Sequence, residues 1–233
     1  MHPDLTKACN ELSRSVAYPT ERSHSFLHSA VCYAAAIRDR SLSIRRDDIP
    51  PRSEKPLHLK GWGDAALGTA RCAHPHTGWL LSIGNSLLHW CSFQQPRVAR
   101  SSVRAELYAS HDLVNFLESL LLCLRTVWQK GVTGTVYTDA KDVLDLVGAD
   151  RPRPSEHAVM KVIESLQEKL LERTLDSLVV QTLSLRDAMD ESKIRLSYVT
   201  TSENRADSLI KSMSPQLLSP FFYRYVKPEE KEK

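Results

Sequence analysis

The sequence of 233 residues has no pattern of paired cysteines. Its cysteines are odd in number, widely spaced and free of any C-x-x-C pair; they are Cys9, Cys32, Cys72, Cys91 and Cys123. Such a set indicates neither a disulfide framework nor a zinc site. We therefore expect a reducing compartment.

Long apolar runs and internal repeats are also missing. The longest apolar stretch, residues 113–124, is interrupted by Asn115, Glu118 and Ser119 and is too short to span a membrane, so it predicts a buried helix. The N-terminus lacks the basic and apolar regions of a signal peptide, and its abrupt start fits a fragment of a longer chain. We expect no membrane association.

The charge is nearly balanced. The formal net charge is +3 and the pI is near 8.6, with 42% hydrophobic and 25% charged residues. This composition is typical of an ordinary globular protein, and the length suits one main domain with an appendage. A charge this small permits contact with a polyanion but does not indicate one by itself.

The chain divides into four parts. Residues 1–45 carry two runs of apolar positions at helical spacing and predict a helical appendage. Residues 46–56 mix charge with three prolines and predict a linker. We expect the main domain at residues 57–213 and a charged, solvated tail at residues 214–233.

The main domain alternates between strand and helix patterns. Strands are predicted at 58–64, 77–83, 87–93, 133–138 and 194–199, and helices at 102–129, 140–147, 156–172, 175–191 and 203–213. The first three strands follow one another and predict an antiparallel meander, while the step from strand to helix after residue 138 favours parallel neighbours. The order predicts an α/β fold with a mixed five-stranded sheet flanked by helices.

Four acidic residues fall where this layout gathers side chains. Asp64 ends the first strand, Glu106 lies in the first turns of the long helix, Asp139 ends the fourth strand, and Asp207 lies in the last helix. Converging carboxylates repel one another unless a cation neutralises them. Two Mg²⁺ or Mn²⁺ ions held by such oxygens can activate water for phosphodiester cleavage. An isolated acid at a strand or helix end is more often a cap or a solvated charge, so only the ordered set carries this prediction.

Basic residues surround the start of the long helix. Arg97, Arg100 and Arg104, with Ser102 at the helix start, fit contacts to a phosphate backbone. A solvated basic face explains the arginines equally well, and Ser101 and Ser102 supply an N-cap in either case.

The segments around the four acids resemble known motifs in the same order. Gly61–Ala66 resembles the strand "SDAD", Thr77–Trp79 with Leu88–Gln95 resembles "SGY…ISWSSKKQ", and Ala99–Ala109 resembles "ALSSTEAEYIA". Tyr137–Ala140 resembles the strand bearing a third acid, Leu196–Lys211 resembles "EYVPTxENxADxLTK", and His2–Arg14 resembles "RPDLxxAVNxLSR". These are motifs of copia-type (Ty1/copia, Pseudoviridae) retrotransposon Pol polyproteins, and the resemblance covers residues 57–213 together with the N-terminal segment.

The resemblance implies a ribonuclease H domain behind a short remnant of the reverse-transcriptase thumb or connection. An RNase H-like fold would hydrolyse the RNA strand of RNA:DNA hybrids, recognised by groove shape and 2′-hydroxyls. Asp64, Glu106, Asp139 and Asp207 would be the metal ligands. The implied partners are the hybrid and the reverse-transcriptase and integrase portions of the same polyprotein. The implied location is intracellular, in cytoplasmic virus-like particles or the nucleus.

Two departures and two alternatives accompany this interpretation. Ala66 replaces the second Asp of "SDAD", which is not a metal ligand in the family, and no histidine stands between Val199 and Asp207, where some RNases H carry a mobile one. The chain is alternatively a catalytically idle module that serves as a spacer or nucleic-acid grip. An integrase or resolvase core of the same superfamily is ranked last, because those proteins lack the Gly-Trp and Ala-Glu-Leu-Tyr contexts seen here.

Overall fold

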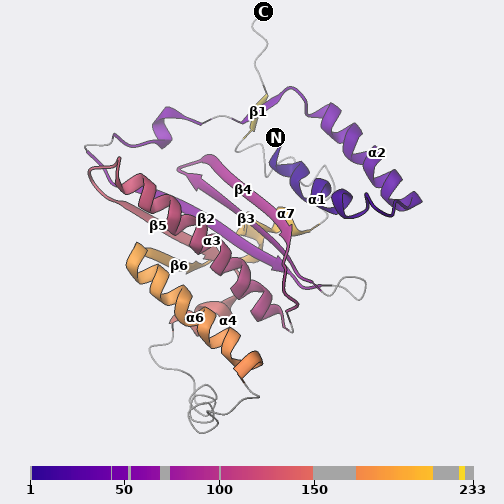
Figure 1. Cartoon of the computed structure of the whole chain (residues 1–233). Coiled ribbons are helices and arrows are strands. Elements are labelled where there is room, and N and C mark those ends of the chain that lie inside the picture. Colours follow the sequence, from indigo (N-terminus) through magenta and orange to yellow (C-terminus); the bar gives the residue numbers. More distant parts are fainter. Residues whose placement is uncertain are drawn as a thin grey trace, which may run out of the picture.

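The centre of the molecule is a mixed five-stranded sheet in the order β4-β3-β2-β5-β6 (Figure 1). The computed structural model describes residues 2–42, 44–51, 54–68, 74–99, 101–148, 172–211 and 226–228. The strands are β2 (Leu57–Ala66), β3 (His76–Ile83), β4 (Ser86–Gln94), β5 (Val132–Thr138) and β6 (Ile194–Tyr198). Pairs β4-β3 and β3-β2 are antiparallel, and β2-β5 and β5-β6 are parallel. The predicted α/β fold class with its mixed sheet is confirmed.

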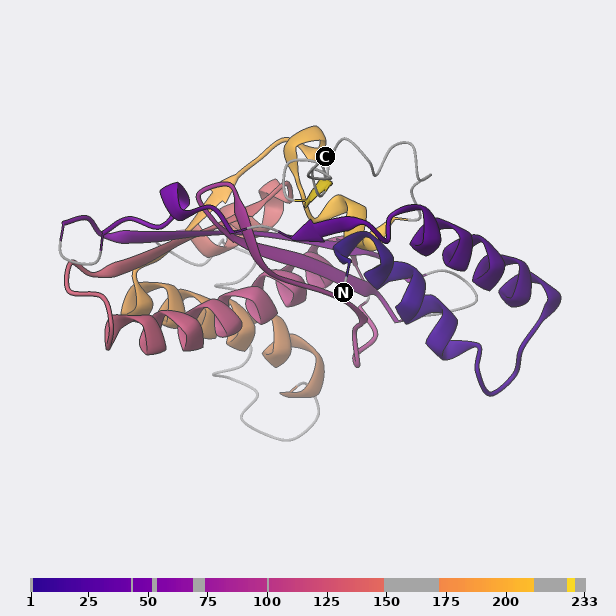
Figure 2. The same ribbon diagram turned by 90° about the horizontal axis from the view of Figure 1, so that it is seen from above.

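Helix α3 (Ser102–Arg125) covers one face of this sheet, with α6 (Glu172–Ser192) beside it (Figure 2). Ser101 caps α3 by accepting a hydrogen bond from the backbone amide of Arg104, at 3.3 Å. The helix buries the apolar stripe predicted from the sequence, in which Leu113, Leu117 and Leu121 have no solvent exposure. It ends at Arg125, earlier than the predicted residue 129, and Gly131 then turns the chain into β5 with a φ of 89°.

The residues of β2 alternate between the two faces of the sheet. Leu57 and Leu59 belong to the apolar core under α3, whereas Trp62 packs in a separate cluster on the opposite face. That opposite face is partly covered by α7 (Asp207–Ile210), which lies across the sheet from α3 (Figure 2). Even-numbered residues of β2, Asp64 among them, therefore point away from the main core.

The N-terminal part is the predicted pair of helices, α1 (Thr6–Arg14) and α2 (Glu21–Ala36). Neither helix buries any residue. The indole Nε1–H of Trp90 on β4 donates to the hydroxyl of Thr6 at 2.9 Å and ties α1 to the sheet.

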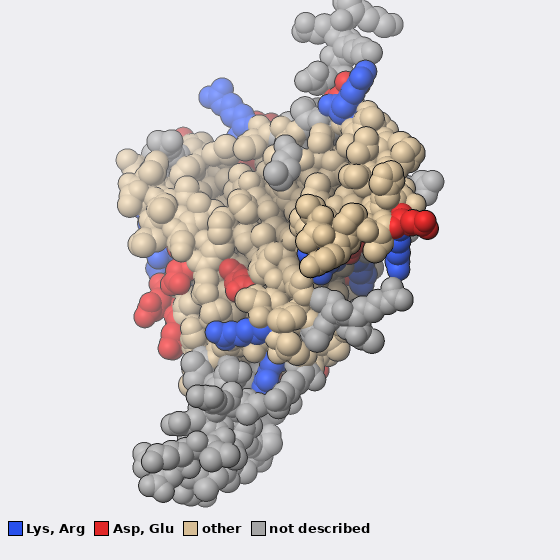
Figure 3. All heavy atoms as spheres, turned by 45° about the vertical axis from the view of Figure 1, so that its right-hand side comes forward, with Lys and Arg blue, Asp and Glu red and all other residues tan. Residues whose placement is uncertain are grey.

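In Figure 3 the charged side chains lie mainly toward the margins of the view, and its middle carries few.

Three local predictions are wrong. Residues 40–42, predicted helical, form strand β1 (Arg40–Leu42), which pairs with β7 (Val226–Pro228) inside the segment predicted to be a solvated tail. Residues 46–48 of the predicted linker form a 3₁₀ turn. A strand depends on its partner, and composition alone does not reveal a partner at the far end of the chain.

The C-terminal helix predicted at residues 203–213 is wrong as well. A 3₁₀ turn at Thr201–Glu203 is followed by extended backbone at Asn204, with φ −70° and ψ 103°, and α7 then has only four residues. The Asn204 side chain accepts a hydrogen bond from the amide of Ala206 at 3.2 Å, which stabilises this break. The additional helix expected at residues 156–172 lies outside the described residues but for its last one, and the domain boundaries stay predictions.

Candidate metal centre

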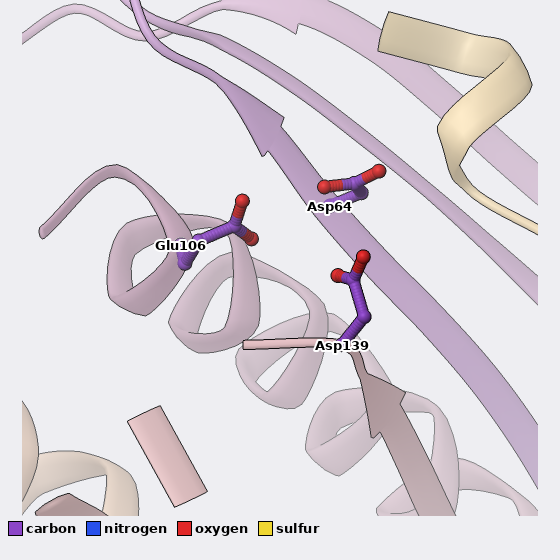
Figure 4. A group of neighbouring side chains, drawn as sticks. All are labelled: Asp64, Glu106 and Asp139. Atoms are coloured by element: carbon purple, nitrogen blue, oxygen red, sulfur yellow. The ribbon is translucent and has the colours of Figure 1, made fainter. Parts of the chain in front are cut away.

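Three of the four predicted acids meet at one end of the sheet. Asp64 on β2, Glu106 on α3 and Asp139 just after β5 each bring a carboxylate oxygen to within 4.8 Å of the other two (Figure 4). Their backbones belong to three elements far apart in the sequence. The parallel pairing of β2 with β5 places Asp64 and Asp139 on adjacent strand ends, and the N-terminal turns of α3 bring Glu106 across.

The Asp64 side chain is almost fully buried, with 5% exposure. Its Oδ1 accepts a hydrogen bond from the Ala65 amide at 2.8 Å, which fixes one oxygen. Opposite it on β3 stands Gly78, where a Cβ would approach the Leu209 Cβ and the Ile210 Cγ2 to 2.7 Å. Glycine at this position therefore lets α7 lie directly against the strand that carries Asp64.

Burial and mutual repulsion raise two pKa values in the cluster. Burial raises the pKa of Asp64 to about 9, with further contributions from the negative charges of Glu106, Asp139 and Asp207. Burial raises the pKa of Glu106 to about 7, although a hydrogen bond from the backbone of Ala65 opposes the shift. The three groups thus disfavour the fully charged state in the absence of a cation.

The Oε2 atom of Glu106 is buried and has no hydrogen-bond partner among the described residues. An unpaired buried carboxylate oxygen is costly, because it has lost its water without gaining a donor. This atom belongs to the same cluster, where the other carboxylates can only accept hydrogen bonds when they are ionised. The site therefore offers oxygen ligands to a group that the protein itself does not supply.

Asn204 contacts the acidic cluster and was not singled out by the sequence analysis. Its buried side-chain amide donates to Oδ1 of Asp139 at 3.1 Å and to the carbonyl of Gly63 at 3.2 Å. The residue thus connects the last segment of the chain to both β2 and Asp139. The sequence analysis expected Asn204 to be the second residue of a helix beginning at Glu203, and this prediction hid the break in the backbone on which its contacts depend.

Asp207 lies beside the cluster rather than within it. The negative charge of Asp207 contributes to the raised pKa of Asp64, and the Oδ1 of Asp207 forms an ion pair with Nζ of Lys211 one turn later. Asp207 is therefore near enough to act on Asp64 but is engaged by a cation from its own segment. The sequence predicted Asp207 as a fourth metal ligand, which stays a prediction, and it did not reveal Lys211 as the partner of Asp207.

Three of the four predicted nucleic-acid contacts, Arg97, Ser102 and Arg104, are described and lie just before α3 or in its first turn. Arg97 and Ser102 are exposed and Arg104 is partly buried, while Arg100 lies outside the described residues. Ser101, not Ser102, supplies the helix cap. Their role at a phosphate backbone stays a prediction.

The chain is similar in sequence to retrotransposon polyproteins. No protein-family model matches the chain. In sequence, the chain is homologous over 90% of its length to copia-type retrotransposon polyproteins. The relatives are the Transposon Ty1-JR2 and Ty1-MR1 Gag-Pol polyproteins of Saccharomyces cerevisiae, each 19% identical over 210 residues. The chain spans 11% of the length of these relatives.

Two solved structures match part of this chain. The N-terminal RNase H domain of a Mycobacterium tuberculosis protein, fused to maltose-binding protein, matches 66% of this chain and 91% of its own, with 13% identity and a TM-score of 0.44. The foamy viral protease-reverse transcriptase in complex with an RNA/DNA hybrid matches 76% of this chain and 22% of its own, with 12% identity and a TM-score of 0.42. Within the described part of the chain, no helix combines the length and apolar character needed to cross a bilayer.

Proposed function

We propose that this chain is a ribonuclease H that hydrolyses the RNA strand of RNA:DNA hybrids in a reaction that depends on Mg²⁺ or Mn²⁺. One observation carries the proposal: carboxylates from β2, α3 and the end of β5 converge within 4.8 Å at the edge of the sheet. The order of the motifs around these acids and the homology to Ty1 Gag-Pol polyproteins support the choice of reaction. Two ions are proposed, as in the two-metal arrangement for phosphodiester cleavage.

The residues present fit a hard divalent cation. All three side chains offer carboxylate oxygens, the ligand type that Mg²⁺ and Mn²⁺ prefer. The unpartnered Oε2 of Glu106 and the raised pKa of Asp64 are both relieved by a positive charge at this point. When bound, the cations supply an activated water and stabilise charge on the leaving oxygen.

The protein's own part is to hold the carboxylates in place. The Ala65 amide fixes Asp64, and the Asn204 amide fixes Asp139. Asp207 is the proposed fourth ligand, and it reaches the cluster on the side of Asp64. Its ion pair with Lys211 would have to open or be shared for Asp207 to serve in that role.

The substrate, partners and location are proposed from the resemblance. A hybrid would be held by its groove shape, with Arg97, Arg100, Ser102 and Arg104 as candidate backbone contacts. The reverse-transcriptase and integrase portions of a longer polyprotein are the proposed protein partners. Virus-like particles in the cytoplasm, or the nucleus, are the proposed location.

The ion pair between Asp207 and Lys211 favours a second candidate function. If the lysine holds Asp207 permanently, the chain is a catalytically idle module that binds nucleic acid or serves as a spacer. Such a module would bind hybrid without cutting it.

A cleavage assay separates these functions. The purified chain is incubated with an RNA:DNA hybrid labelled on the RNA strand, in Mg²⁺, in Mn²⁺ and in EDTA. Cleavage that requires the divalent ion and disappears in Asp64→Asn and in Asp139→Asn supports the nuclease. Asp142→Asn, an exposed acid on α4 (Lys141–Gly148), is the matched control and should cut normally. Retained cleavage in both active-site variants would refute the site, and binding without cleavage by the parent would favour the idle module.

A further inference from the structure

Part of the sheet face opposite α3 is open and carries cationic and hydroxyl side chains. This basic strip consists of His58 and Lys60 on β2, Thr133 on β5, and Arg195 and Ser197 on β6, all of them exposed or partly exposed. These residues share one face because they alternate with the core residues Leu57, Leu59, Val132 and Ile194. Nothing in the proposed reaction uses them.

The basic strip is aligned with the metal centre along the same strands. Lys60 is paired with Thr135 on β5, and Thr135 with Arg195 on β6, so the two cations flank one residue across the sheet. Lys60 precedes Asp64 by four residues on β2, which corresponds to about 13 Å along an extended strand. A chain leaving the carboxylates along this face would meet these cations within a few nucleotides.

The charge on the strip is not neutralised locally. Among the described residues, neither Lys60 nor Arg195 forms an ion pair. Burial lowers the pKa of His58, and the charges of Lys60 and Arg195 lower it further. The positive charges of both residues therefore act on the imidazole of His58. His58 is held between the hydroxyls of Thr133 and Thr135, at 2.9 and 3.2 Å.

The end of the strip far from the carboxylates opens into a hollow of about 630 Å³. Its lining includes His58, Thr133, Arg195 and Lys193, and also the acid Asp190. The cations and hydroxyl groups of this lining match the needs of a phosphate backbone, which requires positive charge and hydrogen-bond donors.

An aromatic pair lies between the basic strip and the carboxylates. The rings of Trp62 and Tyr137 stack with centroids 5.2 Å apart, and the guanidinium of Arg205 lies 4.4 Å from the Trp62 centroid. Tyr137 is partly exposed, whereas Trp62 is buried. Aromatic rings beside a cationic track are the elements with which proteins hold single-stranded nucleic acid.

We propose that the basic strip binds the phosphate backbone of a single-stranded continuation of the nucleic acid whose paired part lies at the metal centre. This inference rests on the proposed function, because it takes its direction from the carboxylate cluster. The strip would favour hybrids that carry an unpaired overhang over blunt hybrids of the same paired length. Its contribution is electrostatic and therefore depends on salt.

The test measures binding rather than cleavage. Fluorescence anisotropy follows hybrids of equal paired length that are blunt, carry an RNA overhang or carry a DNA overhang, in Mg²⁺ and in an Asp64→Asn background that does not cut. In this Asp64→Asn background without further substitutions, an overhang should tighten binding about tenfold. Lys60→Ala/Arg195→Ala should abolish this gain and lower the slope of log affinity against log salt by about 1.4, since each single-strand phosphate contact contributes roughly 0.7. Binding of the blunt hybrid should stay unchanged.

A charge-matched control separates the strip from net charge. Arg22→Ala/Arg38→Ala, on and after α2, removes the same charge from the appendage and should leave the overhang gain intact. Lys60→Gln/Arg195→Gln repeats the test if the alanine pair is destabilised.

Several results would overturn the proposal. One is an unchanged salt slope of binding in both strip variants, and another is an equal loss of the overhang gain in the arginine control. The third is competition by polyglutamate as strong as that by the overhang, which would indicate an acidic protein partner instead. Cleavage of the blunt hybrid by the unmodified chain reports the nuclease separately, so a failure of either proposal is visible without the other.

Discussion

We expect the two faces of the sheet to differ in their roles, one in stability and the other in the proposed function. On the face under α3, Leu57, Leu59 and Val136 are buried against Leu113 and Leu117. On the opposite face, β2 carries Lys60, next to Leu59, and Asp64, four residues after Lys60. Because neighbouring residues of a strand point to opposite sides, a single strand can serve both purposes. Substitutions on the two faces should therefore have different consequences.

The largest loss of stability is expected on the α3 face. Leu117 is fully buried and packs where a side chain on Gly134 would clash, its Cδ2 lying 2.7 Å from the position of a Cβ there. Leu117→Ala should lower the free energy of unfolding by about 2 to 5 kcal/mol, because it removes apolar contacts and leaves a cavity. Urea denaturation measures the change. Leu122→Ala, on the same helix but 65% exposed, should stay within about 0.5 kcal/mol. Equal losses in the two variants would contradict the placement of Leu117, and not Leu122, in the core under α3.

Asn204 should give the next largest effect, and it should alter activity as well. Asn204→Ala leaves Asp139 and the carbonyl of Gly63 without their donor, and we expect a loss of about 2 to 3 kcal/mol in unfolding free energy. Because Asp139 loses its orientation, cleavage should also fall by about tenfold at saturating Mg²⁺. Ser202→Ala, an exposed residue of the preceding turn, is the control. A variant that is destabilised but cuts at the parent rate would show that Asn204 only holds the chain.

Replacement of Asp64 should stabilise the protein in the absence of a cation, whereas replacement of a core residue destabilises it. In EDTA near pH 7, the folded protein holds Asp64 protonated because its pKa is raised to about 9, whereas the unfolded chain leaves it ionised. Asp64→Asn removes the cost of this proton uptake, so unfolding should cost about 2 kcal/mol more than in the parent. Added Mg²⁺ should raise the melting temperature of the parent and much less that of the variant, since ligands that bind only the folded state stabilise it. Differential scanning fluorimetry with and without Mg²⁺ measures both. A parent that gains no stability from Mg²⁺ would argue against a cation at this cluster.

The sequence predicted what depends on local pattern. Asp64 and Asp139 follow β-rich segments, so their positions at strand ends could be inferred, and Glu106 follows a visible helix start. Asn204 could not be assigned, because its contact with Asp139 exists only where the chain breaks before α7. Arg195 and Lys60 lie far apart in sequence, and only the parallel register of β2, β5 and β6 brings them to one row. The pairing of β1 with β7 has the same origin, since each strand alone is three residues long.

The smallest effect is expected at His76, which couples the sheet to α7 on the functional face. Ser92 donates its hydroxyl proton to the carbonyl of Leu209 at 2.6 Å, so its oxygen must accept from Nε2–H of His76, at 2.8 Å. The Nδ1 atom is then unprotonated, buried and without a partner among the described residues. Burial lowers the pKa of His76 to about 3, and the nearby charges of Lys7 and Arg14 act in the same direction.

The folded protein therefore holds His76 neutral, while the unfolded chain binds a proton near pH 6.5. Stability from this residue is complete well above pH 6.5 and is lost as the pH falls from there toward 3, by roughly 1 kcal/mol between pH 6.5 and pH 5.5. Urea midpoints across this range should show the loss in the parent and a flatter profile in His76→Gln. His24→Gln, an exposed histidine of α2, should leave the profile of the parent unchanged. If His76→Gln keeps the full pH dependence of stability, another group causes it. The packing of α7 then does not depend on the protonation of His76.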